Sequence, residues 1–257
     1  MLTRTEELLN KTISNWRSWN VGDSSLTEQP EIVAQMRGGM TNQSFLTSSG
    51  DFKAVVRVNA DNSHALGINR ERETFLLKKA WSTGCVPRLF FADEDTQVTQ
   101  LIPGRMLNSD DIKDKSIQDK LERCIGSIQT TDRGNLTVRK YMDYIDLYAN
   151  QVPSFNGLLD ITYAAKFIDA SDWLPVVCHH DLVPENIIIN GTELYFIDWE
   201  YGHLGHPLID HIKLFGADYC VNKGSRDVID ALLVLQEGIV KLWYALQDSV
   251  GKNFNKS

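Results

Sequence analysis

The chain has 257 residues, of which 42% are apolar, so it can bury a substantial core in one large domain or two lobes. Its formal net charge of −8 argues against a nucleic-acid backbone as the main partner. Its 4 scattered cysteines favour reduced thiols over a disulfide scaffold or zinc ribbon, and predict a cytoplasmic protein. No apolar stretch approaches the roughly 18 residues of a membrane span, and the N-terminus lacks the apolar core of a signal peptide.

Short strands and two helices are expected in the N-terminal part of the chain. Apolar residues recur at helical spacing in segments 5–18 and 68–81. Strands are expected at residues 31–36, 44–47, 54–58, 88–92 and 97–102. Pro103-Gly104 then breaks the chain, so we place a lobe boundary there and predict an N-terminal lobe of residues 1–103.

The rest of the chain, residues 104–257, is predicted to be mostly helical. Helices are expected at residues 114–129, 138–151, 160–170, 207–216 and 226–248. The last of them has a broad apolar face and follows Ser225, a residue type that caps helices well. The order of elements predicts an α+β protein in which a small β-rich lobe precedes a larger helical lobe.

Residues 179–198 contain the motif with the clearest chemical meaning. Residues 179–186 fit the kinase pattern H-R-D-L-x-x-x-N, with His180 in place of the arginine. Asn190-Gly191 lies between two apolar runs and predicts a hairpin with a type I′ turn, because both residues tolerate positive φ. Such a hairpin would bring Asn186 and Asp198 to the same end, which is the geometry that phosphoryl transfer needs.

The residue types in this motif match the parts of a phosphoryl-transfer site. Asp181 is expected to be the catalytic residue, which orients the acceptor hydroxyl and accepts its proton. Asp198 and Asn186 offer hard oxygen ligands to Mg²⁺, which prefers carboxylates together with phosphate oxygens. Asp and Asn also cap turns, and either residue alone would be explained that way. The ordered combination favours the catalytic interpretation.

Three segments make the chain resemble the superfamily of choline/ethanolamine kinases, thiamine kinases and aminoglycoside phosphotransferases. They are residues 38–42, 67–73 and 197–201, and the last, Ile-Asp-Trp-Glu-Tyr, is most similar to bacterial choline and thiamine kinases. The resemblance implies a protein-kinase-like two-lobe fold, ATP as donor, Mg²⁺ as cofactor and a small hydroxylated acceptor. It also implies that His179 and Asp210 brace the catalytic loop.

The same resemblance implies a phosphate-binding loop in the N-terminal lobe. Gly38, Gly39, Thr41 and Asn42 would cover the ATP phosphates, because glycines let backbone N–H groups approach closely and the two polar side chains add donors. Two adjacent glycines without the downstream motif would indicate only a hairpin turn.

Further ATP contacts are implied on the third strand, the following helix and the hinge. Arg57 stands where protein kinases have a lysine, and would neutralise the phosphates with Glu73 as its partner. Glu73 fits better than Glu71, because the residues three and four positions after Glu73 are apolar and share its helix face. Gln100 and Ile102 lie where the hinge is expected, and would meet the adenine through backbone groups.

The acceptor site has the weakest signal in the sequence. A cationic alcohol is held by aromatic faces through cation–π attraction and by nearby carboxylates. The aromatic candidates are Trp199, Tyr201, Tyr219, Trp243 and Tyr244, with Glu200 as the acidic one, although Trp243 also fits core packing. Choline is the first candidate; thiamine, which also has a cationic ring and a hydroxyl, is the alternative. Aminoglycosides would need a wider acidic groove, and the oligomeric state stays open.

Two other classes of function compete with this interpretation. A metallohydrolase would use histidines near carboxylates, among them His179, His180, His203 and His206, but it leaves Asn186 and the hairpin unexplained. A catalytically inactive nucleotide-binding protein is disfavoured, because the expected catalytic and metal-binding side chains are all present.

Overall fold

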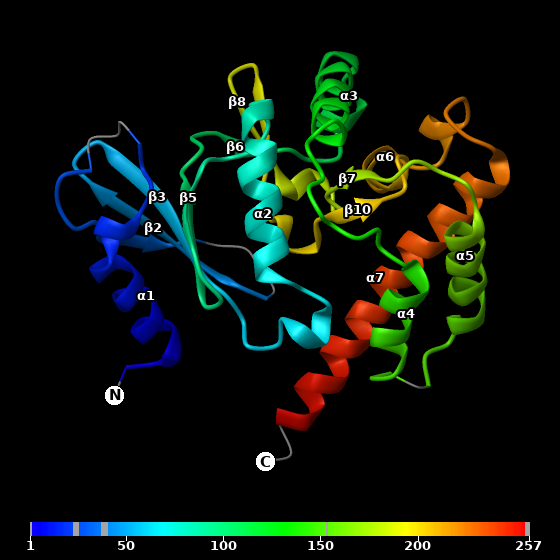
Figure 1. Cartoon of the computed structure of the whole chain (residues 1–257), viewed down its shortest axis with the longest axis horizontal. Coiled ribbons are helices and arrows are strands. Elements are labelled where there is room, and N and C mark those ends of the chain that lie inside the picture. The colour runs from blue at the N-terminus through cyan, green and yellow to red at the C-terminus, as the bar shows by residue number, and fades with distance from the viewer. Residues whose placement is uncertain (1, 23–25, 37–40, 153, 255–257) are drawn as a thin grey trace.

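The computed structural model describes residues 2–22, 26–36, 41–152 and 154–254. A small lobe built on a sheet comes first, and a larger, mostly helical part follows and ends in a long helix (Figure 1). This is the two-lobe α+β architecture expected from the order of elements. None of the helices in the described part of the chain is long and apolar enough to cross a bilayer.

An antiparallel sheet forms the centre of the N-terminal lobe, with the strand order β1-β2-β3-β5-β4. The strands are β1 (Glu31–Gln35), β2 (Gln43–Ser49), β3 (Phe52–Val58), β4 (Leu89–Ala92) and β5 (Thr96–Gln100). Helix α1 (Arg4–Ser14) contacts β3 and packs Leu9 and Ile13 into a cluster that contains Val56 and Val98. Alternation of apolar residues along β3 and β5 places these side chains on the face that α1 covers.

Helix α2 (Arg70–Ala80) joins the two parts of the molecule (Figure 1). It contacts β4 on one side and the 3₁₀ helix Trp199–Tyr201 on the other. The Asn69 side chain caps its start by accepting a hydrogen bond from Arg72 N at 2.7 Å. Glu73 is buried on the same helix, so its carboxylate points toward the interior between the lobes.

A second sheet contains the predicted catalytic hairpin, in the order β6-β8-β9. Its strands are β6 (Arg105–Met106), β8 (Ile187–Asn190) and β9 (Glu193–Phe196). The hairpin is present, but its type I′ turn is not: Asn190 pairs with Glu193, and of the two residues between them only Gly191 has positive φ, at 58°. Positive φ at the first central residue alone is typical of a type II′ turn. The lobe boundary at Pro103-Gly104 stays a prediction.

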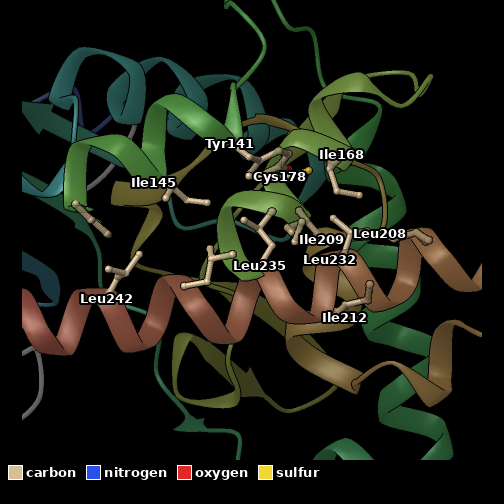
Figure 2. Packing of buried hydrophobic residues seen from close by; sticks show 14 of the residues in the cluster. Tyr141, Ile145, Ile168, Cys178, Leu208, Ile209, Ile212, Leu232, Leu235 and Leu242 are labelled. Carbon is tan, nitrogen blue, oxygen red and sulfur yellow. The ribbon is translucent and has the colours of Figure 1, made fainter. Parts of the chain in front are cut away.

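Longer helices make up most of the C-terminal part. They are α3 (Lys115–Gln129), α4 (Tyr141–Ala149), α5 (Leu158–Ala170), α6 (Ile209–Phe215) and α7 (Arg226–Phe254). Figure 2 shows Leu232, Leu235 and Leu242 on the face of α7 that packs against Ile145 of α4 and Ile168 of α5. Of these three leucines only Leu232 belongs to the apolar face predicted for the last helix; the helix also extends beyond its expected end at residue 248.

Short elements, most of them outside the predicted helices and strands, complete the chain. Strands β7 (Val176–Cys178) and β10 (His203–Gly205) pair in an antiparallel sheet. The 3₁₀ helices are Trp16–Ser18, His64–Leu66, Trp81–Thr83, Asp111–Lys113, Pro184–Asn186, Trp199–Tyr201 and Asp218–Cys220. Such elements are too short to show a period in the sequence, yet β7 and β10 flank the segments that carry the candidate site.

Candidate active site

The predicted catalytic loop, residues 179–186, follows β7 and is held by a buried aspartate of α6. Asp210 accepts hydrogen bonds from the backbone N–H groups of His179 and His180, both at 2.8 Å. The His179 ring nitrogen Nε2 lies 2.8 Å from Ile197 O, which connects the loop to the residue before Asp198. These contacts agree with the bracing roles expected of His179 and Asp210.

Two residues of the site have a strained backbone. His180 (φ 65°) and Asp198 (φ 63°) are the non-glycine residues with positive φ in the described part of the chain. Such conformations cost roughly 1–3 kcal/mol each and persist where the surroundings hold them. Here the hydrogen bonds of Asp210 and His179 hold both segments in place, and the backbone they hold sets where the Asp181 and Asp198 side chains begin.

Asp181 and Asn186 are in direct contact. Asn186 Nδ2 donates to Asp181 O at 2.9 Å and lies 3.3 Å from Asp181 Oδ2. The amide oxygen of Asn186 has no donor in the described part of the chain, so it can face a cation. Lys213 of α6 places Nζ 3.4 Å from Asp181 Oδ1. Lys213 was missed in the sequence because it belongs to no motif and reaches the loop only through the fold.

Asp198 and Asn186 fit a magnesium site by their chemistry. Both line the same cavity and offer a carboxylate and an amide oxygen, which are hard ligands of the kind Mg²⁺ prefers. Burial and the nearby Glu200 carboxylate raise the pKa of Asp198 to about 8, against the opposing effect of Arg57. A divalent cation would reverse this shift, because it favours the ionised carboxylate.

A chain of ion pairs, buried except at Asp198, runs from Asp198 to Glu200. Arg57 donates to Glu73 at 2.8 Å and lies 3.4 Å from Asp198. Arg70 donates to Glu73 at 2.9 Å and to Glu200 at 3.1 Å. Burial raises the pKa of Glu73, but the two guanidinium groups outweigh it and hold that pKa below its ordinary value. The structure thus brings Arg57 and Glu73 together and adds Arg70, which the sequence analysis missed.

The predicted phosphate loop is described only in part. Gly38 and Gly39 lie outside the described residues, and Thr41 lines the cavity. Asn42 is buried, with Nδ2 donating to Glu200 at 2.7 Å and Oδ1 accepting from Ala60 N at 3.1 Å. Both ends of the Asn42 amide are therefore engaged within the protein, which fits an anchor for the loop better than a phosphate donor.

The two predicted hinge residues differ in what their backbone can offer. Gln100 pairs with β3, and its N–H donates to Arg88 O at 2.8 Å, so this donor is already used. Ile102 has a buried side chain, and its backbone N–H and C=O have no hydrogen-bond partner in the described part of the chain. Ile102 is therefore the better placed of the two to meet a nucleotide base.

A cavity of about 620 Å³ opens beside the catalytic loop. Its polar wall includes Thr41, Asp181, Glu185, Asn186, Asp198, Glu200 and Lys213, and its aromatic wall includes Tyr141, Tyr144, Tyr148, Tyr201, Trp243 and Tyr244. Trp243 donates its indole N–H to Tyr201 Oη at 3.0 Å, which sets the two rings against each other. The α4 tyrosines were missed, although their spacing of three and four residues places them on one helix face.

Trp199 does not reach this cavity, contrary to the role expected for it. Its side chain is 1% exposed, and its indole N–H donates to Phe196 O at 2.9 Å. Its ring packs 4.9 Å from the His179 ring, centroid to centroid. We therefore assign Trp199 to the core and keep Glu200, Tyr201 and Trp243 as the predicted acceptor residues that line the cavity.

Two histidines of the competing metallohydrolase interpretation have hydrogen-bond partners that shape the loop. His179 Nε2 lies 2.8 Å from Ile197 O, and His206 Nδ1 accepts from Leu208 N at 3.1 Å. Within the described residues no three His, Cys, Asp or Glu side chains gather as ligands for a metal ion. The histidines near the loop thus support its shape, and this geometry does not favour a hydrolytic transition-metal centre.

A loop with the kinase catalytic pattern thus lies between a sheet lobe and a helical part and beside an aromatic cavity, an arrangement typical of the protein-kinase-like class of folds. The sequence model of the family described as Choline/ethanolamine kinase matches residues 33–221. The chain therefore belongs to the choline/ethanolamine kinase family, and the resemblance seen in the three sequence segments is confirmed.

Individual relatives agree with this assignment. Protein LicA of Haemophilus influenzae is 28% identical over 198 residues, which cover 71% of this chain and 57% of that protein. The probable ethanolamine kinase of Arabidopsis thaliana is 26% identical over 247 residues, which cover 86% of this chain and 64% of that protein. The chain thus spans less than two thirds of the length of these two curated relatives.

Solved structures share the fold. The choline kinase LicA from Streptococcus pneumoniae has a TM-score of 0.76 at 24% identity, covering 97% of this chain and 92% of that one. A thermostable mutant of the aminoglycoside phosphotransferase APH(4)-Ia has a TM-score of 0.64 at 14% identity, covering 88% and 90%. The predicted protein-kinase-like fold is therefore confirmed.

Proposed function

We propose that the protein transfers the γ-phosphoryl group of ATP, with Mg²⁺, to the hydroxyl of a small cationic alcohol, with choline as the first candidate. One observation carries the proposal: Asp181, Asn186 and Asp198 line the same cavity as Tyr201 and Trp243. Groups suited to phosphoryl transfer and groups suited to a cation therefore face one space. The choline kinase named among the structural neighbours and the ethanolamine kinase named among the relatives support this acceptor class.

On the donor side, Mg²⁺ would be held by Asp198 and Asn186 and would neutralise charge on the phosphates when bound. Arg57, braced by Glu73, fixes the position of Asp198 and adds a positive charge beside it. Ile102 would meet the adenine through its free backbone groups. A structure of LicA in complex with AMP, with a TM-score of 0.77 at 23% identity, supports a nucleotide site. Use of ATP would place the reaction in the cytoplasm.

On the acceptor side, Asp181 would accept a hydrogen bond from the substrate hydroxyl and take its proton as the bond to phosphorus forms. Lys213 and Asn186 hold the two oxygens of this carboxylate from either side, so its direction is set before substrate binds. Tyr201 and Trp243, which line the same cavity as Asp181, would place their ring faces against the cationic group of the acceptor.

A coupled assay of ADP release tests this function directly. Choline, ethanolamine, thiamine and an aminoglycoside would be offered with MgATP, and 3,3-dimethylbutanol would serve as the neutral analogue of choline. A desolvated cation–π contact is worth about 2 kcal/mol, so choline should be preferred to the neutral alcohol by roughly thirtyfold. Equal kcat/KM for choline and the neutral alcohol would refute the proposed cation-binding site. Turnover of the aminoglycoside alone would refute a small cationic alcohol as the acceptor.

A further inference from the structure

The acceptor cavity contains a buried positive charge that the proposed reaction does not use. Arg139 precedes α4, and its backbone N–H donates to Leu204 O at 2.9 Å. Its side chain is 6% exposed, lines the cavity, and donates through Nη2 to Tyr201 O at 2.9 Å. The guanidinium carbon lies 4.3 Å from the centre of the Tyr144 ring, so an internal cation already covers this aromatic face.

Unlike Arg57 and Arg70, Arg139 has no carboxylate partner in the described part of the chain. Arg57 and Arg70 both pair with Glu73, whereas Arg139 is held by a carbonyl and a ring. Arg72, whose pKa is lowered to about 10 by burial and by the charge of Arg139, donates only to backbone oxygens as well. Buried charges are ordinarily paired, so an unpaired one on a cavity wall points to a ligand.

The carboxylates of the cavity do not compensate Arg139, because most of them have partners of their own. Asp181 pairs with Lys213, and Asp198 pairs with Arg57. Glu200 pairs with Arg70, and the exposed Glu185 has no ion pair within the described residues. At about 620 Å³, the cavity is in the range that encloses drug-sized ligands, and the acceptor would share it with the transferred phosphoryl group.

We propose that Arg139 is a specificity-determining residue that sets the charge of the acceptor: a second cationic group is excluded, and an acidic substituent binds against the guanidinium. The inference rests on the proposed acceptor site and narrows it to alcohols with a single cationic group. It favours those that are zwitterionic. An acidic substituent would complete an ion pair in a desolvated site, where charge-assisted hydrogen bonds are strong.

A matched series of acceptors tests this proposal on the unmodified protein. One N-methyl group of choline is replaced by a carboxymethyl, a carbamoylmethyl or a trimethylammonioethyl group. The first two have similar size and differ in charge. We expect kcat/KM to be higher for the carboxymethyl compound than for the carbamoylmethyl compound by about tenfold, and lowest for the dication. The carboxylates around the cavity would by themselves give the opposite order, so this result would identify a cation in the wall.

Substitution of Arg139 assigns the effect to this residue. In Arg139→Gln the preference for the carboxymethyl compound should disappear and the dication should gain about tenfold in kcat/KM relative to choline. Arg139→Lys keeps the charge and should keep the order. A role limited to folding would lower kcat/KM for all acceptors alike and leave their ratios unchanged. Where Arg139→Gln does not fold, the proposal is still refuted if either the unmodified protein or Arg139→Lys shows no preference for the carboxymethyl compound.

The outcomes separate this proposal from the function on which it rests. One outcome would overturn the role of Arg139 and leave the proposed function intact: choline is phosphorylated, but kcat/KM for the carbamoylmethyl compound equals or exceeds that for the carboxymethyl compound. No turnover of any compound, and no shift of Tm when each is added without ATP, would overturn the acceptor class and this inference with it. Ratios that follow acceptor charge in the unmodified protein and vanish in Arg139→Gln would establish the proposal.

Discussion

Charged side chains on the proposed donor side of the cavity are paired with one another. The proposed acceptor wall consists of aromatic rings and of Arg139, which has no carboxylate partner among the described residues. Ion pairs run from Asp198 through Arg57 and Glu73 toward Glu200, and hold the donor side by electrostatics. The acceptor wall is held by packing of α4 and α7. Substitutions on the donor side should therefore affect turnover and stability, and those on the acceptor wall should affect the choice of substrate.

The largest effect is expected from Asp181→Asn. Turnover with choline should fall about 10²–10⁴-fold, because the amide can no longer take the hydroxyl proton. Nucleotide binding should stay within about twofold, because phosphates and metal are held elsewhere. Steady-state kinetics and titration with a fluorescent ATP analogue measure the two quantities. The exposed Asp143→Asn is the control, and an Asp181→Asn enzyme with half the unmodified rate would refute the assignment.

Asp198→Ala should combine a loss of turnover with a change in metal dependence. Removal of one Mg²⁺ ligand should raise the metal concentration for half-maximal rate at least about tenfold, since few protein ligands hold this ion. Excess Mg²⁺ should restore part of nucleotide binding and little of the rate. Titration of activity with Mg²⁺ at fixed ATP gives the answer, and an unchanged midpoint would show that Asp198 is not a ligand.

Glu73→Ala tests whether electrostatics holds the donor side together. Arg57 and Arg70 would both lose a buried partner, so the free energy of unfolding should fall by about 3–5 kcal/mol. Glu71→Ala, on the exposed side of the same helix, should change it by less than about 0.5 kcal/mol. Urea unfolding measures the free energy of unfolding of the two variants. Equal decreases in that free energy would show that the ion pairs of Glu73 do not stabilise the proposed donor side.

Trp243→Leu sharpens the acceptor side of the comparison. Loss of the indole face should raise KM for choline by roughly thirtyfold and leave KM for ATP nearly unchanged. Trp199→Phe is the matched control, because its ring lies in the core next to His179 and should lower Tm without changing KM for choline. A rise in KM from Trp199→Phe and none from Trp243→Leu would reverse the two assignments.

Much of the donor side could be predicted because its residues lie in short motifs or on one helix face. The hairpin between Asn186 and Asp198 has a strong local turn signal, and Glu73 has a helix periodicity that turns it inward. Trp199 shows where such reasoning fails. It follows Asp198 in the chain, but the positive φ of Asp198 turns the backbone, so the indole enters the core while Glu200 lines the cavity.

Periodicity and turn signals determined the order of elements, and the kinase pattern determined the residues of the predicted catalytic loop. The resemblance of three short segments pointed to the family. All of these rest on local patterns in the sequence. The acceptor wall was decided only by the tertiary structure. Arg139 meets Tyr201 across 62 residues, and Trp243 meets Tyr201 across 42. Such contacts depend on how α4, α7 and the loop after Asp198 converge, and no periodic pattern records that convergence. The presence of the Arg139 charge in the wall of the proposed acceptor pocket therefore follows only from the tertiary packing.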